Sequence, residues 1–373
     1  MVIDYSQETI NILRLIRSQN VGSKTFINII NFFGSSETAL NNIAEFSLKG
    51  GRKKPIKLYS EEEALKELEN LEKHNAKLVT YTDPKYSRLL LEIADFPPIL
   101  TYKGNIELLN HQRIIAVVGA RNCSVNGKLF ASKLSKDLVA ANYATVSGLA
   151  RGIDTAVHTA SIGNTIAVIA GGIDHIYPPE NKKLFETISK EGLIIAELPI
   201  GSKPLSTHFP QRNRIIAGLS LATAVIEAGL KSGSLITANM ALEQNRDLFA
   251  VPGFPLYPRC LGTNKLIKDG AYLLESSSDI ISNITSYGKL QKTLEESKEY
   301  DNNSSFQENN KVLDISDIDR KKVINLLSAS PIAIETLIVE AELPVNIIYA
   351  ICLELELAGR ITKYPGNRIA LIY

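Results

Sequence analysis

Tryptophan is absent from this chain of 373 residues, cysteine is scarce, and neither sign of charge prevails. The three cysteines, Cys123, Cys260 and Cys352, lie far apart and form no CxxC pair. That usage argues against a disulfide framework and a zinc site, and indicates reduced thiols in a cytoplasmic protein. Because the formal net charge is only +1 at pH 7, any site for nucleic acid or another polyanion has to come from local clusters of basic residues.

Long apolar runs are also missing. No run reaches the roughly 18 residues that a membrane helix needs. The first residues, MVIDYSQETINILRLIRSQ, place acidic and polar side chains where a signal peptide has a basic segment and an apolar core. We therefore expect a cytoplasmic protein with no membrane association.

The sequence lacks the motifs of several enzyme classes. GxGxxG and GxxxxGK[ST] do not occur, which argues against NAD(P) binding and P-loop ATP hydrolysis. Ser147 follows a predicted strand, but the GxSxG pattern of a nucleophile elbow is not met. Asp154 and His158 are four residues apart on a predicted helix, a spacing that more often gives a local hydrogen bond than a catalytic dyad. Paired carboxylates and metal-ligand spacings are not evident, so we predict no catalytic residue, no metal and no cofactor.

Changes in pattern divide the chain into four segments. Residues 1–75 carry apolar residues at i, i+3 and i+4 in TINILRLIRS and TFINIINFF and predict a small all-helical domain. Residues 76–287 have an α/β pattern, and the polar residues 288–311 are expected to form a linker. Residues 312–373 read as three helices and a hairpin with PGN at its turn, the pattern of a winged helix.

Residues 76–287 alternate short β-rich runs with helix-length segments. The runs include RIIAVVGA, YATVSGLA, TIAVIAGG, LIIAELP, LATAVIEAG and DLFAVPG. Strands that are apolar on both faces predict a mostly parallel sheet with helices on both sides, which is a doubly wound α/β fold.

The ends of these runs are the places to look for a site, because ligands of an open parallel sheet bind beyond the carboxyl ends of its strands. Six predicted strand ends lead into GARNCSVNGK, SGLARGID, GGIDHIYPPEN, ELPIGSKP, AGLKSGS and PGF. Glycine lets a backbone approach a ligand closely, and each following helix offers free N–H groups to an anion. One such turn is more often fold geometry than a site, but six together indicate a shared rim suited to phosphate.

Basic residues cluster near these turns without acidic neighbours. Residues 108–136 and residues 198–226 contain Lys and Arg but no Asp or Glu. In HFPQRNRIIAGLS, at 208–220, Arg212 and Arg214 lead directly into an apolar run that reads as protein interior. We place Arg121 and Arg212 at turns, where an anion contact is more probable than an ordinary solvated position.

Eight ordered motifs carry a resemblance to a known family. They are FPPILTYKGN, VVGARNCS, VSGLARGIDTAVH, GGIDHIYPPEN, FPQRNRIIAGLS, EAGLKSGSLITA, LFAVPG and LGTNKLIKDGA. Over about residues 76–275 they resemble the DNA-processing protein DprA (Smf) family, and the flanking domains fit that family's layout. The resemblance implies an extended Rossmann-like core that binds single-stranded DNA without known catalysis and forms a homodimer. It also implies protection of incoming DNA and loading of the recombinase RecA onto it during natural transformation.

The resemblance implies roles for individual residues as well. Arg121 would contact a phosphate, the FPQRNR motif would form a second basic wall, and Phe209 would stack on a base. With the strand-end residues, the predicted DNA-binding set is Gly119, Arg121, Ser124, Ser147, Gly148, Gly171, Gly172, Lys203, His208, Phe209, Arg212, Asn213, Arg214, Ser232, Gly233 and Ser234. Within this set, Arg214 has the alternative of bracing the turn through a buried pairing. A cationic groove with an aromatic platform predicts salt-sensitive binding with little sequence preference.

The flanking domains depart from the expected DNA-binding patterns. The N-terminal unit resembles a SAM or helix-hairpin-helix domain, but its hairpin QNVGSK has one glycine instead of a pair, which argues against direct DNA binding there. The basic loop GGRKKPIK could add phosphate contacts. The third helix of the winged helix carries Glu354 and Glu356 and only Arg360, which is unfavourable in a major groove and favours a protein-contact or regulatory role.

A second hypothesis, from a different class, is a nucleotide-processing hydrolase of a related Rossmann-like fold. The segment KSGSLITANMALEQ is similar to the glutamate-containing loop of nucleoside-monophosphate phosphoribohydrolases, with Glu243 as the candidate acid. The second glycine pair of that loop is missing here.

Overall fold

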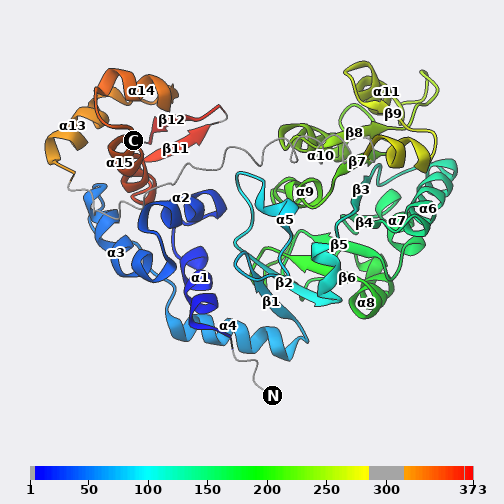
Figure 1. Ribbon diagram of the computed structural model, residues 1–373, viewed down its shortest axis with the longest axis horizontal. Coiled ribbons are helices and arrows are strands. Elements are labelled where there is room, and N and C mark those ends of the chain that lie inside the picture. The colour runs from blue at the N-terminus through cyan, green and yellow to red at the C-terminus, as the bar shows by residue number, and fades with distance from the viewer. Residues whose placement is uncertain (1–4, 285–314, 365, 373) are drawn as a thin grey trace, which may run out of the picture. The chain divides into compact units, whose positions relative to one another are not determined.

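The computed structural model describes residues 5–284, 315–364 and 366–372 (Figure 1). By their contacts, the residues divide into two units, one made of residues 1–66 together with residues 305–373, the other of residues 67–304. The linker expected at 288–311 lies outside the described residues. Among the described helices, none alone has the length and apolar composition to cross a membrane; helices 334–341 and 345–357, bent by 119°, meet those criteria only as a pair.

The first unit begins with the predicted all-helical domain. Its helices are α1 (Gln7–Arg17), α2 (Ser23–Phe33), α3 (Ser36–Lys49) and α4 (Glu61–Lys73), the last of which continues into the second unit. Ser6 and Ser35 start α1 and α3 by accepting backbone N–H bonds from Thr9 and Thr38. Burial of Leu13, Phe26, Ile29 and Ile43 supplies the core, as the i, i+3, i+4 spacing of apolar residues requires.

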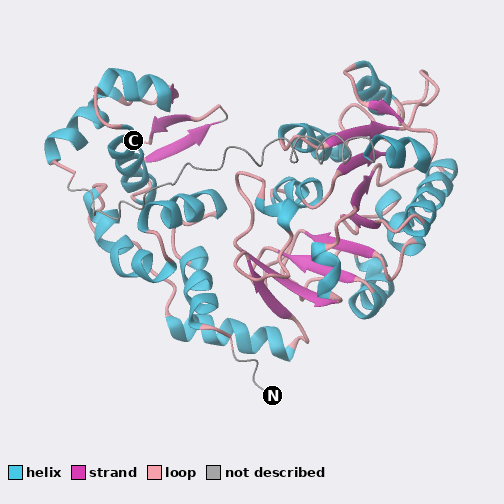
Figure 2. Ribbon diagram, in the orientation of Figure 1, coloured by secondary structure: helices cyan, strands magenta, loops and turns pink. Residues whose placement is uncertain are grey.

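The winged helix has the predicted three helices and hairpin. The helices are α13 (Asp317–Leu326), α14 (Ile334–Ala341) and α15 (Val345–Leu357). The hairpin is formed by β11 (Ile361–Tyr364) and β12 (Arg368–Leu371), and a short strand, β10 (Ile332–Ala333), pairs with the outer side of β12. Figure 2 shows this small sheet beside its helices.

The second unit is built on a nine-stranded sheet with the order β1-β2-β6-β5-β4-β3-β7-β8-β9. Its strands are β1 (Lys77–Thr80), β2 (Ile99–Gly104), β3 (Ile114–Val118), β4 (Ala144–Ser147), β5 (Thr165–Ile169), β6 (Leu193–Ala196), β7 (Ala222–Val225), β8 (Asp247–Ala250) and β9 (Tyr272–Leu273). The strands from β6 to β9 are parallel, while β1 and β2 add an antiparallel edge. The mostly parallel, doubly wound prediction is confirmed.

Helices cover both faces of this sheet. They are α5 (Arg88–Leu91), η1 (Ile106–Asn110), α6 (Val125–Ala140), α7 (Ile153–Ala160), η2 (Pro179–Asn181), α8 (Lys182–Glu191), α9 (His208–Gly218), α10 (Gly233–Glu243) and α11 (Leu261–Lys268), and residues 277–284 are also helical. Alternation along β3 separates the two cores: Ile114, Ala116 and Val118 pack with residues of α9 and α10, whereas Ile115 and Val117 pack with residues of α6 and α7. Complete burial of β3, β4, β5, β6 and β7 explains why these central strands are mostly apolar on both faces.

The strand order locates the binding edge. Successive strands run outward from β3 through β4 and β5 to β6, and outward in the other direction from β7 through β8 to β9. The order therefore reverses between the neighbours β3 and β7, and a crevice opens at such a switch point beyond the carboxyl ends of the strands. Gly119 to Ser124 leave β3 at this point, and the connection to α10 leaves β7.

One sequence expectation about this edge is wrong. Arg212 was placed at a turn, but it lies inside helix α9, and the helix begins at His208. The apolar residues Ile215 and Ile216 that follow are the buried face of this helix and precede β7 in the chain.

Candidate nucleic-acid interface

A cleft of about 760 Å³ opens at the switch point. Its walls come from the β3–α6 connection, the first half of α9 and the start of α10. From the predicted set, the cleft is lined by Gly119, Arg121, Phe209, Arg212, Asn213, Ser232, Gly233 and Ser234. Gly148 and Gly171 line a small adjoining hollow together with Arg121 and Phe209. Residues that are distant in the sequence are thus brought to one surface.

An aromatic ring is the centre of this surface. The guanidinium carbon of Arg121 lies 5.0 Å from the centroid of the Phe209 ring, and that of Arg212 lies 6.0 Å from it. The Tyr177 ring is 5.6 Å from the Phe209 ring, at an interplanar angle of 59°. Both cations are within the range of a cation–π interaction, so Phe209 is flanked by two positive charges and a second aromatic ring.

Arg121 is the accessible cation of this group. Its side chain is exposed, and within residues 5–284 and the described C-terminal ranges no carboxylate lies at ion-pair distance from it. The backbone beside it is fixed, because Gly152 adopts φ = 83° and packs against the carbonyl groups of Ala120 and Arg121. A side chain at Gly152 would be strained and would collide with that loop. Arg121 is therefore presented to solvent on a rigid connection.

Arg212, by contrast, is buried. Its side chain is only 6% exposed; it donates from NH1 to the carbonyl oxygens of Gly148, at 2.6 Å, and Val168. Nε donates to the Asn213 side chain at 3.1 Å. Burial is the main reason that the pKa of Arg212 falls to about 10, which still leaves the guanidinium charged at pH 7. Arg212 is thus a fixed, largely buried positive charge in the wall of the cleft.

Glycine at position 148 is required by this arrangement. A β-carbon there would overlap the Arg212 guanidinium. Asp154 lies close behind and accepts backbone N–H bonds from Gly148 and Ala150, each at 3.2 Å. Burial raises the pKa of the Asp154 carboxyl, while the Arg212 charge and these hydrogen bonds act in the opposite direction. Asp154 therefore fixes the loop at Gly148 and Ala150 and balances the charge of the buried Arg212.

His158 is a core residue. It is fully buried, its Nδ1 lies 2.7 Å from Thr165 Oγ1, and its Nε2 accepts the Leu149 N–H at 3.3 Å. Burial, followed by the nearby Arg212 charge, lowers its pKa to about 3. The imidazole is neutral, and both of its nitrogens have partners. Asp154 bonds to the backbone of Gly148 and Ala150 instead, so the two residues do not form a catalytic dyad.

The sequence predicts phosphate contacts at the N-termini of α6 and α10, and these two termini differ in accessibility. The first turn of α10 lines the cleft through Ser232, Gly233 and Ser234, where the Ser232 hydroxyl accepts the Ser234 N–H at 3.4 Å. A helix N-terminus attracts anions. The first turn of α6 is already occupied, since Glu227 accepts both the backbone N–H of Ser124, at 2.9 Å, and its hydroxyl. A carboxylate at that position disfavours a phosphate beside it.

Other residues of the predicted set have structural partners. Ser147 is fully buried and donates to the Val117 carbonyl at 2.7 Å, and Gly172 packs against Pro199 and Gly201. His208 accepts the Leu205 N–H at 3.3 Å in the loop that starts α9. Lys203 is exposed in that same loop.

Arg214 adopts the alternative role considered from the sequence. It pairs with Glu197, and its Nε lies 3.4 Å from Asp95. Its side chain is 11% exposed. Glu197 directly follows β6, so Arg214 ties α9 to the sheet.

Sequence reasoning did not select Tyr177, Pro204 or Thr237, which also line the cleft. Tyr177 belongs to GGIDHIYPPEN, a strand-end segment that was singled out for its glycines only. An aromatic side chain in such a segment was the available signal. Glu243, the candidate acid of the hydrolase hypothesis, is exposed at the last residue of α10. At about 1.5 Å per residue, it is roughly 15 Å from the end of the helix that faces the cleft.

Comparison with known proteins agrees with this architecture. The model of the DNA recombination-mediator protein A family matches residues 77–285, a model of a DprA-like N-terminal HHH domain matches residues 6–70, and a model of a DprA winged helix domain matches residues 308–367. Protein Smf of Synechocystis sp. is 35% identical over 85% of this chain and 86% of its own length. DNA processing protein DprA of Bacillus subtilis is 45% identical over 54% of this chain and 69% of its own length.

Solved structures show the same relationship. DNA processing protein A of Streptococcus pneumoniae superimposes with a TM-score of 0.62 at 34% identity, covering 75% of this chain and 98% of that one. DNA processing protein A of Helicobacter pylori, whose structure was described for its single-stranded DNA binding mode, gives a TM-score of 0.52 at 27% identity over 56% of this chain and 96% of that one. The first family model alone spans more than half of the residues, and with these relatives it shows that the chain belongs to the DprA (Smf) family of DNA-processing proteins.

Proposed function

We propose that this protein binds single-stranded DNA in the cleft at the β3–β7 switch point and that it does so without catalysis. The observation that carries the proposal is the stack of the exposed Arg121 on Phe209, 5.0 Å apart, on the wall of that cleft. Proteins that bind single strands combine a cationic groove along the backbone with an aromatic ring that accepts any base. The described single-strand binding mode of the Helicobacter pylori relative supports the assignment.

The charges on the wall favour a bound anion. Arg121 and Arg212 both approach the Phe209 ring, and the Arg121 charge helps to lower the pKa of Arg212 because the two cations repel each other. A phosphate beside them would replace that repulsion with attraction, and the planar guanidinium of Arg121 suits bidentate contact with phosphate oxygens. The first turn of α10, which also lines the cleft, offers a helix N-terminus to a further phosphate.

The family also suggests a role after the strand is bound. We propose that the protein acts as a homodimer, protects incoming single strands and loads RecA onto them in natural transformation. Family membership supports this role. Contacts to the phosphate backbone of DNA suit this role, since a protein that loads RecA has to accept strands of any sequence and release them.

Fluorescence anisotropy with a labelled dT oligomer and the matching duplex, over a salt series, tests the first step. We expect tighter binding of the single strand and a log–log salt slope of about −0.7 for each neutralised phosphate. Equal affinity for both DNAs would contradict the proposed site. RecA filament growth on protein-coated single strands, measured with and without this protein, tests the loading step separately, and binding without faster filament growth would refute loading alone.

A further inference from the structure

Helix α15 of the winged helix packs against the N-terminal helical domain as well as against its own domain. Leu353, Glu354 and Leu357 are 4%, 1% and 0% exposed, and α2 and α3 of the N-terminal helical domain pack against α15. In DNA-reading winged helices the corresponding recognition helix lies in the major groove with its side chains on base edges. Here the second half of the helix, residues 350–357, is covered by protein of the same chain, while Val345 and Tyr349 in its first half are exposed.

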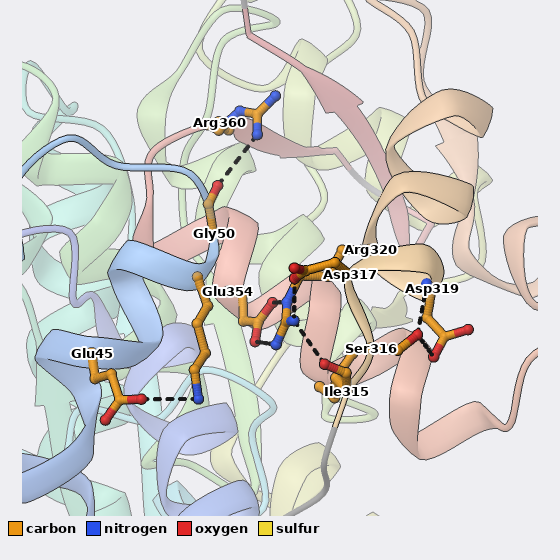
Figure 3. Close-up of polar contacts among 10 residues, drawn as sticks. Glu45, Gly50, Ile315, Ser316, Asp317, Asp319, Arg320, Glu354 and Arg360 are labelled. Atoms are coloured by element: carbon orange, nitrogen blue, oxygen red, sulfur yellow. Dashed lines mark hydrogen bonds and ion pairs between the residues drawn. The ribbon is translucent and has the colours of Figure 1, made fainter.

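Helix α15 packs closely against the end of α3 at Gly50. A β-carbon at Gly50, which ends α3, would overlap the carbonyl oxygen of Glu354 and lie 2.9 Å from the Ala358 side chain. The Gly50 carbonyl accepts a bond from Arg360 NH1 at 3.4 Å (Figure 3). Gly50 has φ = −68° and ψ = −2°, a conformation open to any residue. Glycine is therefore needed at this position for the approach of α15 rather than for the turn itself.

The N-terminal domain also satisfies the end of α15. The last carbonyl groups of a helix have no partner within the helix. The Leu357 carbonyl accepts from the Asn20 side chain at 3.2 Å and from Arg52 NH1 at 3.5 Å. The positive Arg52 also complements the negative end of the helix dipole. Both partners come from the helical domain, so α15 is capped from outside its own fold.

The acidic residues that made this helix unsuitable for DNA have partners in this arrangement. Glu354 accepts two bonds from Arg320 of α13, at 2.8 and 2.9 Å (Figure 3). Glu356 pairs with Lys363 of the wing at 2.6 Å and accepts the Thr25 hydroxyl of α2 at 2.8 Å. The sequence Val345–Leu357 contains no Lys, Arg or His, so the helix has nothing with which to neutralise phosphate.

We propose that α15 is a protein-docking helix whose partner is the N-terminal helical domain of the same chain, and that the winged helix does not read duplex DNA through it. The segments that precede and follow the Rossmann-like core are thereby joined into one folded module. This inference is independent of the single-strand site, which lies in the other unit.

Gly50→Val in the full-length chain tests the docking by hydrogen exchange. We expect residues 350–358 to exchange on the order of tenfold faster or more, because the overlapping side chain separates α3 from α15. Gly22→Val is the matched control, since Gly22 lies in the same domain, has extended backbone and has open space around its β-position. Unchanged exchange in Gly50→Val would overturn the proposal.

Two readouts guard against simple unfolding of the variant. Exchange in α1 and in the strands of the core should stay at the wild-type level in Gly50→Val. The double variant Asn20→Ala and Arg52→Ala removes the two caps, together with the local Arg52 bonds to Lys54 and Gln19, and should produce a smaller rise centred on the end of α15. Exchange that rises uniformly over the first unit in both variants would contradict a specific docking contact.

Cross-linking identifies the partner. Lys24 of α2 and Lys363 of the wing line the same groove, so a short amine-reactive reagent should join them in the wild-type protein and not in Gly50→Val. In a mixture of light and nitrogen-15-labelled chains, links within one chain are expected, and links between light and heavy chains would refute the same-chain partner. If a short duplex protected residues 350–357 from exchange in the wild-type protein, duplex reading through α15 would be established and the proposal overturned.

Discussion

The guanidinium of Arg121 stacks on the ring of Phe209, with 5.0 Å between the guanidinium carbon and the ring centroid. The arginine follows β3, and the phenylalanine belongs to the first turn of α9. The strand order reverses between the neighbours β3 and β7, so the connections that follow these strands open into one crevice. A cation and an aromatic ring are thus adjacent, the combination that the proposed single-strand site requires.

Arg121→Ala should weaken binding of a dT oligomer on the order of tenfold or more, because one charge-assisted contact worth about 1.5–3 kcal/mol is lost. The log–log salt slope should become shallower by about 0.7. The melting temperature should not change, since the side chain is exposed. Lys128→Ala, which removes another exposed charge outside the cleft, is the control. An unchanged salt slope in Arg121→Ala would remove this residue from the site.

Phe209→Leu should weaken binding without changing the salt slope. Leucine keeps apolar volume in α9 but loses the flat ring, and stacking is worth about 1–3 kcal/mol per base, roughly 5- to 150-fold in affinity. Phe209→Tyr should retain most of the binding. Anisotropy titrations at several salt concentrations separate this effect from that of Arg121, and a slope that changes in Phe209→Leu would contradict a stacking role.

Arg212→Ala should destabilise the core by about 3–5 kcal/mol, because it leaves the Gly148 and Val168 carbonyls and the buried Asp154 without their cation. Gly148→Ala should produce a smaller loss by displacing the same guanidinium. Urea unfolding followed by circular dichroism measures both. A wild-type free energy of unfolding in Arg212→Ala would show that Arg212 is a surface contact rather than a buried brace.

His158 should make the core sensitive to acid. Its pKa is lowered to about 3 in the folded protein by burial, whereas it is about 6.5 in the unfolded chain. Between these values the unfolded state binds more protons, so the free energy of unfolding should fall by about 1.4 kcal/mol for each pH unit below 6.5. Asp154, whose pKa is raised, acts in the opposite direction at the acidic end. The difference between wild type and His158→Gln isolates the histidine, and an equal pH dependence in both would contradict the assignment.

Arg320→Met should destabilise the winged helix by about 3–5 kcal/mol, because Glu354 is 1% exposed and would be left as an unpaired buried carboxylate. The double variant Arg320→Met and Glu354→Leu should recover most of that loss, since apolar residues of similar volume often replace a buried ion pair at little cost. Thermal unfolding of the two variants measures the coupling. A double variant as unstable as the single one would show that the pair acts through packing alone.

Local sequence pattern was enough to predict the class of fold and to bring Arg121 and the first turn of α10 to the candidate cleft. The apolar strands of the core, the spacing of the N-terminal helices and the three helices with a hairpin at the C-terminal end are confirmed. Each of these rests on periodicity, which burial imposes directly on neighbouring residues. Arg121 and the first turn of α10 were found for a similar reason, since residues that leave a parallel strand must reach the same edge of the sheet.

Which side chain faces the cleft was decided by tertiary structure. Arg212 and Arg214 are alike in sequence, but helix α9 directs one to the carbonyls of Gly148 and Val168 and the other to Glu197. Ser124 starts helix α6 and was predicted to contact DNA, but Glu227, which follows β7, accepts its backbone N–H. The acidic character of α15 was visible in the sequence, whereas its cover by the helical domain was not, because that contact joins residues more than 300 positions apart. Periodicity records whether a residue is buried; only the folded chain determines what it is buried against.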